Sequence, residues 1–140
     1  MNANNFSFAS FNQTRDFEVD NSNFVSHIRR DVKGKEYEST YWKAEEVFME
    51  FGEEHIYSVQ GVYVNDLSGN RNAITMESAA VAIEDRYVTV PSFQIKDIKR
   101  MLESDYAIKM IREGHLGFTI ESYISSLGTT CYKLVWCDIA

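Results

Sequence analysis

The chain has 140 residues, of which 44% are hydrophobic and 25% are charged, with a single proline. This composition is typical of a globular domain and excludes a disordered or low-complexity chain. The net charge of −7 argues against direct binding of nucleic acid, because DNA- and RNA-binding proteins usually present a dominant basic face.

The sequence gives no sign of export or of membrane insertion. The first 17 residues contain no basic residue before Arg15 and no apolar run of the kind that a signal peptide needs. No stretch approaches the roughly 18 consecutive apolar residues of a membrane span. Cys131 and Cys137 would lie about 20 Å apart on one strand, beyond the reach of a disulfide. We therefore expect a cytoplasmic protein with free thiols.

Residues 1–13 are rich in asparagine and serine and carry three phenylalanines. Phe6 and Phe8 would share one face of a short strand. The segment is therefore predicted to be either an edge strand or a loose tail held by aromatic contacts. Residues 14–140 are predicted to form a single α+β domain.

A helix is predicted over residues 21–33. Asn21 or Ser22 can cap its first turn, and Gly34 offers a stop. Between them, apolar residues recur near one stripe of a helix. These residues are Phe24, Val25, Ile28 and Val32.

A second helix is predicted from the cap Thr40 to a stop at Gly52. Its core-facing stripe would consist of Tyr41, Ala44, Val47, Phe48 and Phe51. The rest of this helix is acidic: residues 36–54 hold seven glutamates and one lysine, and so most of the net charge of the chain. Trp42 and Met49 are predicted to lie on the flank where the glutamates begin.

Strands are expected in the middle of the chain. Residues 55–64 show a mixed alternation, and residues 66–70 have the composition of a turn, from which residues 73–76 would return as a second strand. Residues 79–83 and 86–90 are predicted to form a hairpin, with a short helix over 76–83 as the alternative. Two helices should follow, over residues 93–102, capped by Ser92, and from Ser104 or Asp105 to Gly114.

The C-terminal residues 116–138 predict a β-hairpin. Phe118 and Ile120 alternate with polar residues, and residues 126–128 can form a three-residue loop with Gly128 in the left-handed conformation. In that register Phe118 lies opposite Trp136 and Ile120 opposite Leu134. Residues 131–138 carry apolar side chains on both faces, which indicates a strand interior to the sheet.

Taken together, the elements predict an α+β fold with an antiparallel sheet of about five strands, three to four helices and a central C-terminal hairpin.

Catalytic motifs are absent from the sequence. It contains no glycine-rich phosphate loop, HExxH, CxxC or GxSxG, and we predict no catalytic residue, metal ligand or cofactor. A small enzyme with a pocket that the sequence does not reveal is one alternative. It would use His115 with Cys137, or a buried carboxylate. Glu46 and Glu50 share a helix face at i and i+4, but nothing in the sequence supplies burial for them.

The predicted site is a surface. A glutamate-rich helix with a flanking tryptophan and methionine can engage a basic groove electrostatically and anchor in it through the aromatic ring. The partner-binding residues would be Trp42, Glu45, Glu46, Met49, Glu50 and Glu53.

In its small size, acidity, 14% aromatic content and lack of catalytic motifs, the chain resembles phage-encoded inhibitors such as anti-CRISPR proteins, and less closely toxin-immunity proteins. The resemblance implies a non-enzymatic inhibitor of a basic, nucleic-acid-handling protein. A self-associating structural or assembly subunit is a further alternative.

Overall fold

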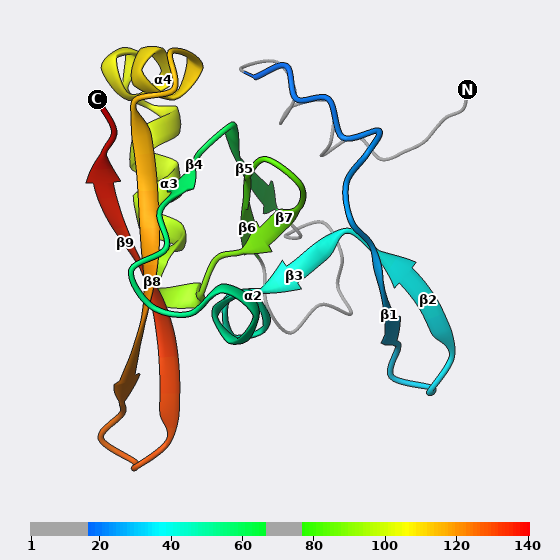
Figure 1. The fold of residues 1–140 in the computed structure, drawn as a ribbon. Helices are drawn as coiled ribbons and strands as arrows, with labels where there is room; N and C mark the ends of the chain where they lie inside the picture. The colour runs from blue at the N-terminus through cyan, green and yellow to red at the C-terminus, as the bar shows by residue number, and fades with distance from the viewer. Residues whose placement is uncertain (1–16, 67–76) are drawn as a thin grey trace.

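The computed structural model describes residues 17–66 and 77–140. Within these ranges the chain is α+β, with three α-helices and nine strands (Figure 1). The helices are α2 (Ala44–Phe51), α3 (Ile95–Leu102) and α4 (Asp105–Arg112), and the 3-10 turn η1 (Ser92–Gln94) precedes α3. The strands are β1 (His27–Arg30), β2 (Glu36–Ser39), β3 (Tyr41–Lys43), β4 (Tyr57–Ser58), β5 (Gly61–Asp66), β6 (Glu77–Ala82), β7 (Tyr87–Thr89), β8 (Leu116–Ile124) and β9 (Thr130–Asp138).

The strands are divided among three sheets. Strands β1 and β2 form an antiparallel pair, a second sheet has the order β3-β7-β6-β5, and a third has the order β4-β8-β9. All neighbours are antiparallel except β3 and β7, which run parallel. The α+β class is therefore confirmed, whereas the expectation of one sheet of about five strands is wrong.

The chain changes sheets at Val59 and Gln60. The amide of Val59 donates to the carbonyl of Leu116, which begins β8, at 2.9 Å, and the amide of Gln60 donates to the carbonyl of Ala82, which ends β6, at 2.7 Å. The strand predicted over residues 55–64 is consequently two short strands in different sheets. Tyr57, Val59 and Val62 are buried while Gln60 is exposed, so the run does not keep the burial period of one continuous strand, which explains the mixed alternation of the sequence.

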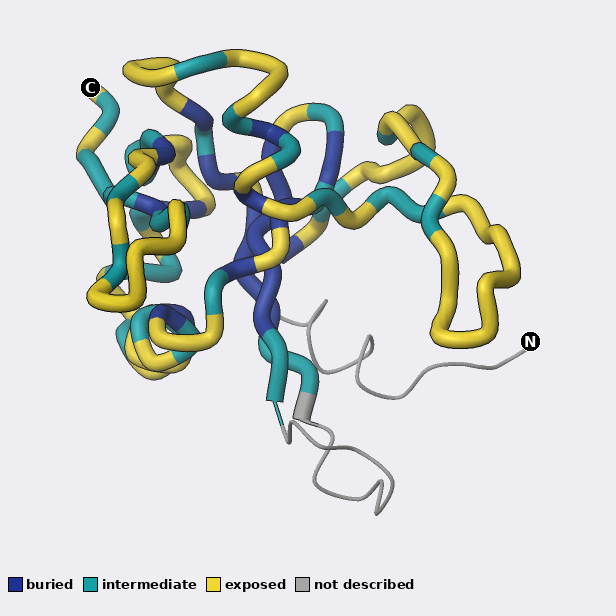
Figure 2. The backbone as a smooth tube through the Cα atoms, turned by 90° about the horizontal axis from the view of Figure 1, so that it is seen from below, coloured by how far each residue is buried: buried dark blue, intermediate teal, exposed yellow. Residues whose placement is uncertain are grey.

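The core lies between the two larger sheets, and α2 and α3 each contact both of them. Its largest fully buried side chains are Phe118, Ile98, Ile120 and Leu134. The buried backbone gathers in the middle of the molecule, while the β1–β2 hairpin projects from it as an exposed arm (Figure 2). No helix in residues 17–66 or 77–140 is both long and apolar enough to cross a membrane.

The predicted register of the C-terminal hairpin is confirmed. Phe118 lies opposite Trp136, and Ile120 lies opposite Leu134. Gly128 has a φ of 83°, and the amide of Ser125 donates to the carbonyl of Thr129 at 2.9 Å. The three-residue loop thus forms as its glycine requires.

The prediction that residues 131–138 lie inside a sheet is wrong, because β9 is an edge strand. Part of its outer edge is instead occupied by Gln94, a residue only 6% exposed. The Gln94 amide nitrogen donates to the Leu134 carbonyl at 2.7 Å, and the Gln94 oxygen accepts from the Leu134 amide at 2.9 Å. One side chain therefore bonds the backbone where a neighbouring strand would. Val135 and Cys137, on the second face, are half-buried.

The helix predicted over residues 21–33 is replaced by the β1–β2 hairpin. The Asp31 carboxylate accepts from the amides of Lys33 and Lys35 at 2.8 and 2.9 Å, and Gly34 adopts a φ of 85°, so the turn is stabilised locally. His27 and Arg29, two residues apart, both bond the carbonyl of Tyr41. These contacts follow the period of a strand and override the helical spacing of the apolar residues.

The remaining predicted elements match the structure closely. Strands β6 and β7 form the expected hairpin, not the alternative helix over residues 76–83. Helix α4 lies where the sequence places it, and the Ser104 hydroxyl caps it by accepting from the amide of Ala107 at 3.1 Å. Helix α3 begins at Ile95, two residues later than predicted, because residues 92–94 form the turn η1, and the predicted cap Ser92 is wrong, since no side chain caps either element. The N-terminal segment 1–13 and the strand predicted over residues 73–76 lie outside the described residues.

Candidate partner-binding surface

The acidic helix α2 begins at Ala44, three residues later than predicted. The Glu46 carboxylate closes the first turn by accepting from the amide of Lys43 at 2.7 Å. Before it, β3 pairs with β7, and the ring of Tyr41 stacks on that of Tyr87 at 4.6 Å. The predicted cap Thr40 lies before this strand, because pairing with β7 holds Tyr41 and Trp42 in an extended conformation.

Trp42 therefore lies on β3 and is engaged inside the molecule. Its ring stacks on the ring of His27, with 3.7 Å between the centroids and an interplanar angle of 7°. Its indole nitrogen donates to the carbonyl of Val25 at 3.0 Å, and the guanidinium carbon of Arg86 lies 4.5 Å from the ring centre. Trp42 thus joins the segment before β1 to the centre of the fold.

Glu46 and Glu50, the i, i+4 pair of α2, each bind a cation of this chain. Glu46 pairs with Arg29 at 3.2 Å and lies 3.8 Å from a ring nitrogen of His27. Glu50 pairs with both terminal nitrogens of Arg86, at 2.9 and 3.0 Å. Both carboxylates therefore hold α2 to other elements.

Arg86 is the most enclosed charge of the described residues, with a side chain only 3% exposed. Besides its two bonds to Glu50, it donates from Nε and Nη2 to the two oxygens of Asp85, each at 3.0 Å. Burial alone would lower the pKa of Arg86, but the hydrogen bonds and charges of Asp85 and Glu50 outweigh burial and raise it. Arg86 is therefore a permanent cation with two anionic partners.

The other three predicted residues point outward. Met49 is 74% exposed, and Glu45 and Glu53 are exposed and form no hydrogen bond or ion pair with the rest of the described chain. The six predicted residues thus fall into two groups. Trp42, Glu46 and Glu50 make internal contacts, whereas Glu45, Met49 and Glu53 are available to a partner.

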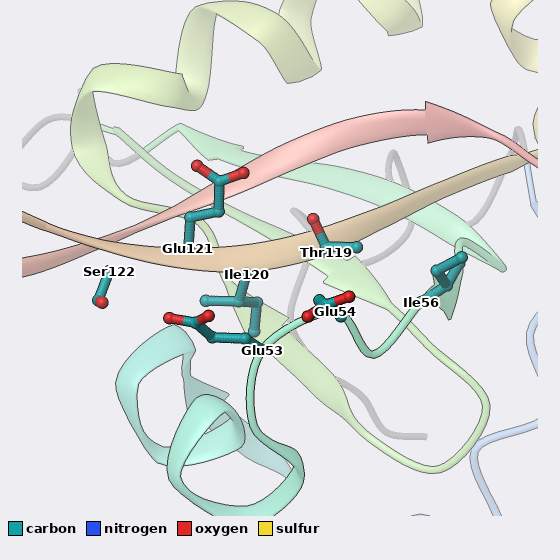
Figure 3. A pocket seen from close by; sticks show the side chains of 7 residues that line it. All are labelled: Glu53, Glu54, Ile56, Thr119, Ile120, Glu121 and Ser122. Atoms are coloured by element: carbon teal, nitrogen blue, oxygen red, sulfur yellow. The ribbon is translucent and has the colours of Figure 1, made fainter.

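A hollow of about 440 Å³ lies between the loop after α2 and strand β8 (Figure 3). We call it the acidic hollow; its lining residues are Glu53, Glu54, Ile56, Thr119, Ile120, Glu121 and Ser122. Gly52 and Glu54 both have a positive φ, of 81° and 66°, so the chain turns sharply there and brings Glu53 and Glu54 to β8. None of the lining residues is basic.

A second, smaller hollow of about 240 Å³ lies on the other side of Ile56, which lines both. We call it the tyrosine pocket; its lining residues are Phe51, His55, Ile56, Tyr57, Ser58, Ile83, Glu84 and Asp85. Tyr57 is only 4% exposed and stacks on Phe118 at 5.1 Å. Its hydroxyl has no hydrogen-bond partner in the described structure. Burial raises the pKa of Tyr57 to about 12.

The alternative enzyme would need the His115 imidazole next to the Cys137 thiol, and the described structure shows no hydrogen bond between them. Ring nitrogen Nδ1 of His115 lies 3.0 Å from the carbonyl oxygen of Ile139. The Cys131 thiol donates to the carbonyl of Thr129, and both cysteines are free and half-buried. Over residues 17–66 and 77–140, no hydrogen bond joins His115 to Cys131 or Cys137.

Sequence reasoning missed three features of this surface. Glu121 joins Glu53 and Glu54 only because β4 pairs with β8, and Tyr57 is one aromatic residue among many until the fold encloses its hydroxyl. Arg86 carries no sequence signal beyond its place after a predicted turn. No protein-family model, no curated protein and no solved structure matches this chain, so the function has to be argued from these residues alone.

Proposed function

We propose that this protein is a binding protein that docks its acidic hollow onto a basic surface of a partner protein. The observation that carries the proposal is the hollow itself, which has three carboxylates and no lysine or arginine among its lining residues. Charge complementarity of this kind accelerates encounter and selects the partner.

Exposed apolar side chains adjoin the hollow and supply an anchor. Ile56 lines it and is 58% exposed, and Met49, in the last turn of α2, is 74% exposed. A flexible methionine adapts to an irregular partner surface, and apolar contacts that lose their water contribute most of the energy of an interface. Glu45 and Glu53, which precede and follow Met49 in the chain, add two further exposed carboxylates to this surface.

The partner class that fits is a nucleic-acid-handling protein. Such proteins carry basic grooves that bind phosphates, and an acidic chain in the groove would compete with the nucleic acid. This mode of action is that of an inhibitor, as the resemblance to phage-encoded inhibitors implies. The contribution of Glu46 and Glu50 would be indirect, through the position of α2.

The test compares two double charge reversals of equal net charge. Glu53→Lys/Glu54→Lys changes the acidic hollow, and Glu18→Lys/Glu103→Lys changes exposed glutamates elsewhere. Wild type and both variants serve as baits in the source organism, and captured proteins are identified by mass. We expect wild type and the control to capture the same basic protein and the hollow variant to lose it. Equal capture by both variants would refute the proposal.

Self-association is a second candidate, favoured by the exposed β1–β2 arm. Val32, at the tip of this arm, is fully exposed, and Lys33 and Lys35 lie beside it. This tip is apolar and basic, so it is complementary to the acidic hollow of another copy. A molecular mass that rises with concentration, and falls back in Val32→Ser, would support this candidate.

A further inference from the structure

Strand β8 has a neighbour along the whole of one edge but along only part of the other. Strand β9 pairs with it from Leu116 to Ile124. On the opposite edge, β4 pairs with Gly117 and Phe118 alone, and the amide of Val59 donates to the carbonyl of Leu116. Beyond Phe118, no described strand lies on this side of β8. We call this part of the strand the open edge.

The register of the hairpin shows which backbone groups point to the open edge. The amide of Ser125 donates to the carbonyl of Thr129 at 2.9 Å. At the other end of the hairpin, the amide of Ile139 donates to the carbonyl of His115 at 2.8 Å. Odd-numbered residues therefore bond across the hairpin, and in an antiparallel pair they alternate with residues whose N–H and C=O groups point to the outer edges. The even-numbered residues of β8 thus point away from β9, as the carbonyl of Leu116 does.

Ser122 and Ile124 are the even-numbered residues of the open edge that solvent reaches. Both are exposed, and Ile124 is 67% exposed. Within residues 17–66 and 77–140, their backbone amides and carbonyls form no hydrogen bond. Ile120, nearer the core, is only 1% exposed and is not available to another molecule. An unpaired strand edge of this kind is a template for an added strand.

Strand β8 also lacks most of the features that protect an exposed edge from pairing. Such features include lysine or proline in the strand, a bulge, or a covering group. The sequence of β8 contains no lysine, arginine or proline, and its pairing with β9 is continuous. By contrast, the Gln94 side chain bonds both backbone groups of Leu134 on the outer edge of β9. The edge of β8 has no equivalent of Gln94 in the described structure.

The acidic hollow borders the open edge and determines which kind of strand fits. Ser122 lines the hollow together with Glu53, Glu54 and Glu121. Figure 3 shows Glu121 on the opposite side of β8 from Ile120 and Glu53, so an added strand would have a carboxylate on each side. A second copy of this chain would bring its own Glu121 to the same edge, and like charges on paired strands are destabilising. A strand that carries lysine or arginine is favoured instead.

We propose that the open edge of β8 binds an extended segment of another protein by strand addition and that, resting on the proposed function, this segment belongs to the basic partner. Its backbone pairs with the N–H and C=O groups of Ser122 and Ile124. Side chains of a strand alternate between its two sides. Basic side chains of the segment therefore lie on the side of Glu121, and apolar side chains lie on the side of Ile124.

The test uses a nonapeptide of alternating lysine and valine with blocked ends and needs no partner. Hydrogen exchange of the backbone amides of the whole chain is followed by NMR with and without the peptide. At saturation we expect exchange at Ser122 and Ile124 to slow about tenfold or more, because their amides become hydrogen-bonded. The amides of Glu121 and Tyr123, which already bond β9, should not change.

A nonapeptide with glutamate in place of lysine is the control for charge and should not bind. Three results would overturn the proposal. The first is no binding of the lysine peptide, and the second is binding that leaves exchange at Ser122 and Ile124 unchanged. The third is protection at Thr130 and Tyr132, which would place the added strand on the edge of β9.

A matched pair of variants assigns the binding to the open edge. Ser122→Pro removes an N–H that points to this edge and takes no bond from β9, and proline is tolerated at strand edges. Ser122→Ala keeps the N–H and removes only the hydroxyl. We expect Ser122→Pro to weaken the lysine peptide about tenfold and Ser122→Ala to bind it as wild type does. Equal affinity of the two variants would contradict the assignment, and if Ser122→Pro does not fold, the exchange data on wild type decide.

Partner capture separates this proposal from the proposed function. If the peptide protects Ser122 and Ile124 but Ser122→Pro captures the partner as Ser122→Ala does, the partner does not add a strand to β8, and docking through the acidic hollow still stands. If Glu53→Lys/Glu54→Lys captures the partner as wild type does, the proposed function fails whatever the peptide shows.

Discussion

Replacing Arg86 by methionine tests whether Glu50 stabilises the fold through its ion pair, in contrast to the exposed Glu45 and Glu53. The substitution removes four hydrogen bonds and two ion pairs while a methionine side chain fills most of the space and keeps contact with Trp42. It leaves Glu50 and Asp85 side by side without a cation. Glu45, Glu53 and the acidic hollow are untouched.

The expected loss in free energy of unfolding follows from the burial of Arg86. Breaking a buried ion pair costs about 3–5 kcal/mol, because a charge is left without its partner. Arg86 is 3% exposed, but the carboxylates of Glu50 and Asp85 are 43% and 41% exposed and can regain water. We therefore expect the lower limit, about 3 kcal/mol, out of the total of about 5–15 kcal/mol typical of a domain. The melting temperature should fall by roughly 10 °C.

Urea unfolding of wild type, Arg86→Met and Arg100→Met measures this loss, with tryptophan fluorescence and far-ultraviolet circular dichroism as the two probes. Arg100 is exposed on α3 and serves as the control, with an expected change within about 0.5 kcal/mol. A loss below about 1 kcal/mol for Arg86→Met would refute the structural role of the pair. Glu50 would then return to the residues available for a partner.

Three further predictions concern Glu50, Gln94 and Tyr57. Glu50→Gln should cost about 1 kcal/mol, and Glu45→Gln almost nothing, because only Glu50 binds a cation of this chain; equal losses in urea unfolding would contradict the division of the glutamates. Gln94→Met should cost about 2–4 kcal/mol and remove hydrogen-exchange protection at Leu134, since a buried amide and carbonyl lose their partner; a protected Leu134 amide would show that another group bonds it. Stability should fall as the pH rises from about 10 to about 12, because the unfolded chain loses the proton of Tyr57 first while the folded pKa is about 12. The free energy of unfolding of Tyr57→Phe should fall less than that of wild type over this pH range. Equal pH dependence of the two proteins would mean that the hydroxyl is not buried in solution.

The parts of the fold that were predicted correctly are those determined by local chemistry. The C-terminal hairpin is defined by a glycine with φ of 83° and by alternation on both sides of it. Helix α4 begins at a serine cap and is followed by Gly114, and all of these signals lie within a few residues of what they determine. For such elements a single sequence is sufficient.

Residues 21–33 show why other parts could not be predicted. Their apolar spacing suits a helix, but His27 stacks on Trp42 and Arg29 pairs with Glu46, contacts that no local pattern contains. The candidate site shows the same limit. The outward position of Glu45 was predictable from the helix, whereas the internal role of Glu50 depends on a buried arginine 36 residues away.

The pairing of β4 with β8 determines when, during synthesis of the chain, the acidic hollow can form. Strand β8 follows β4 by more than fifty residues, so the acidic loop after α2 is synthesised long before the strand that forms the other wall of the acidic hollow. Pairings between distant segments are slow, because the intervening chain must first be closed into a loop. A chain still leaving the ribosome would therefore carry the glutamates of this loop before β8 can form the other wall of the acidic hollow, and the hollow is complete only once the C-terminal hairpin has folded.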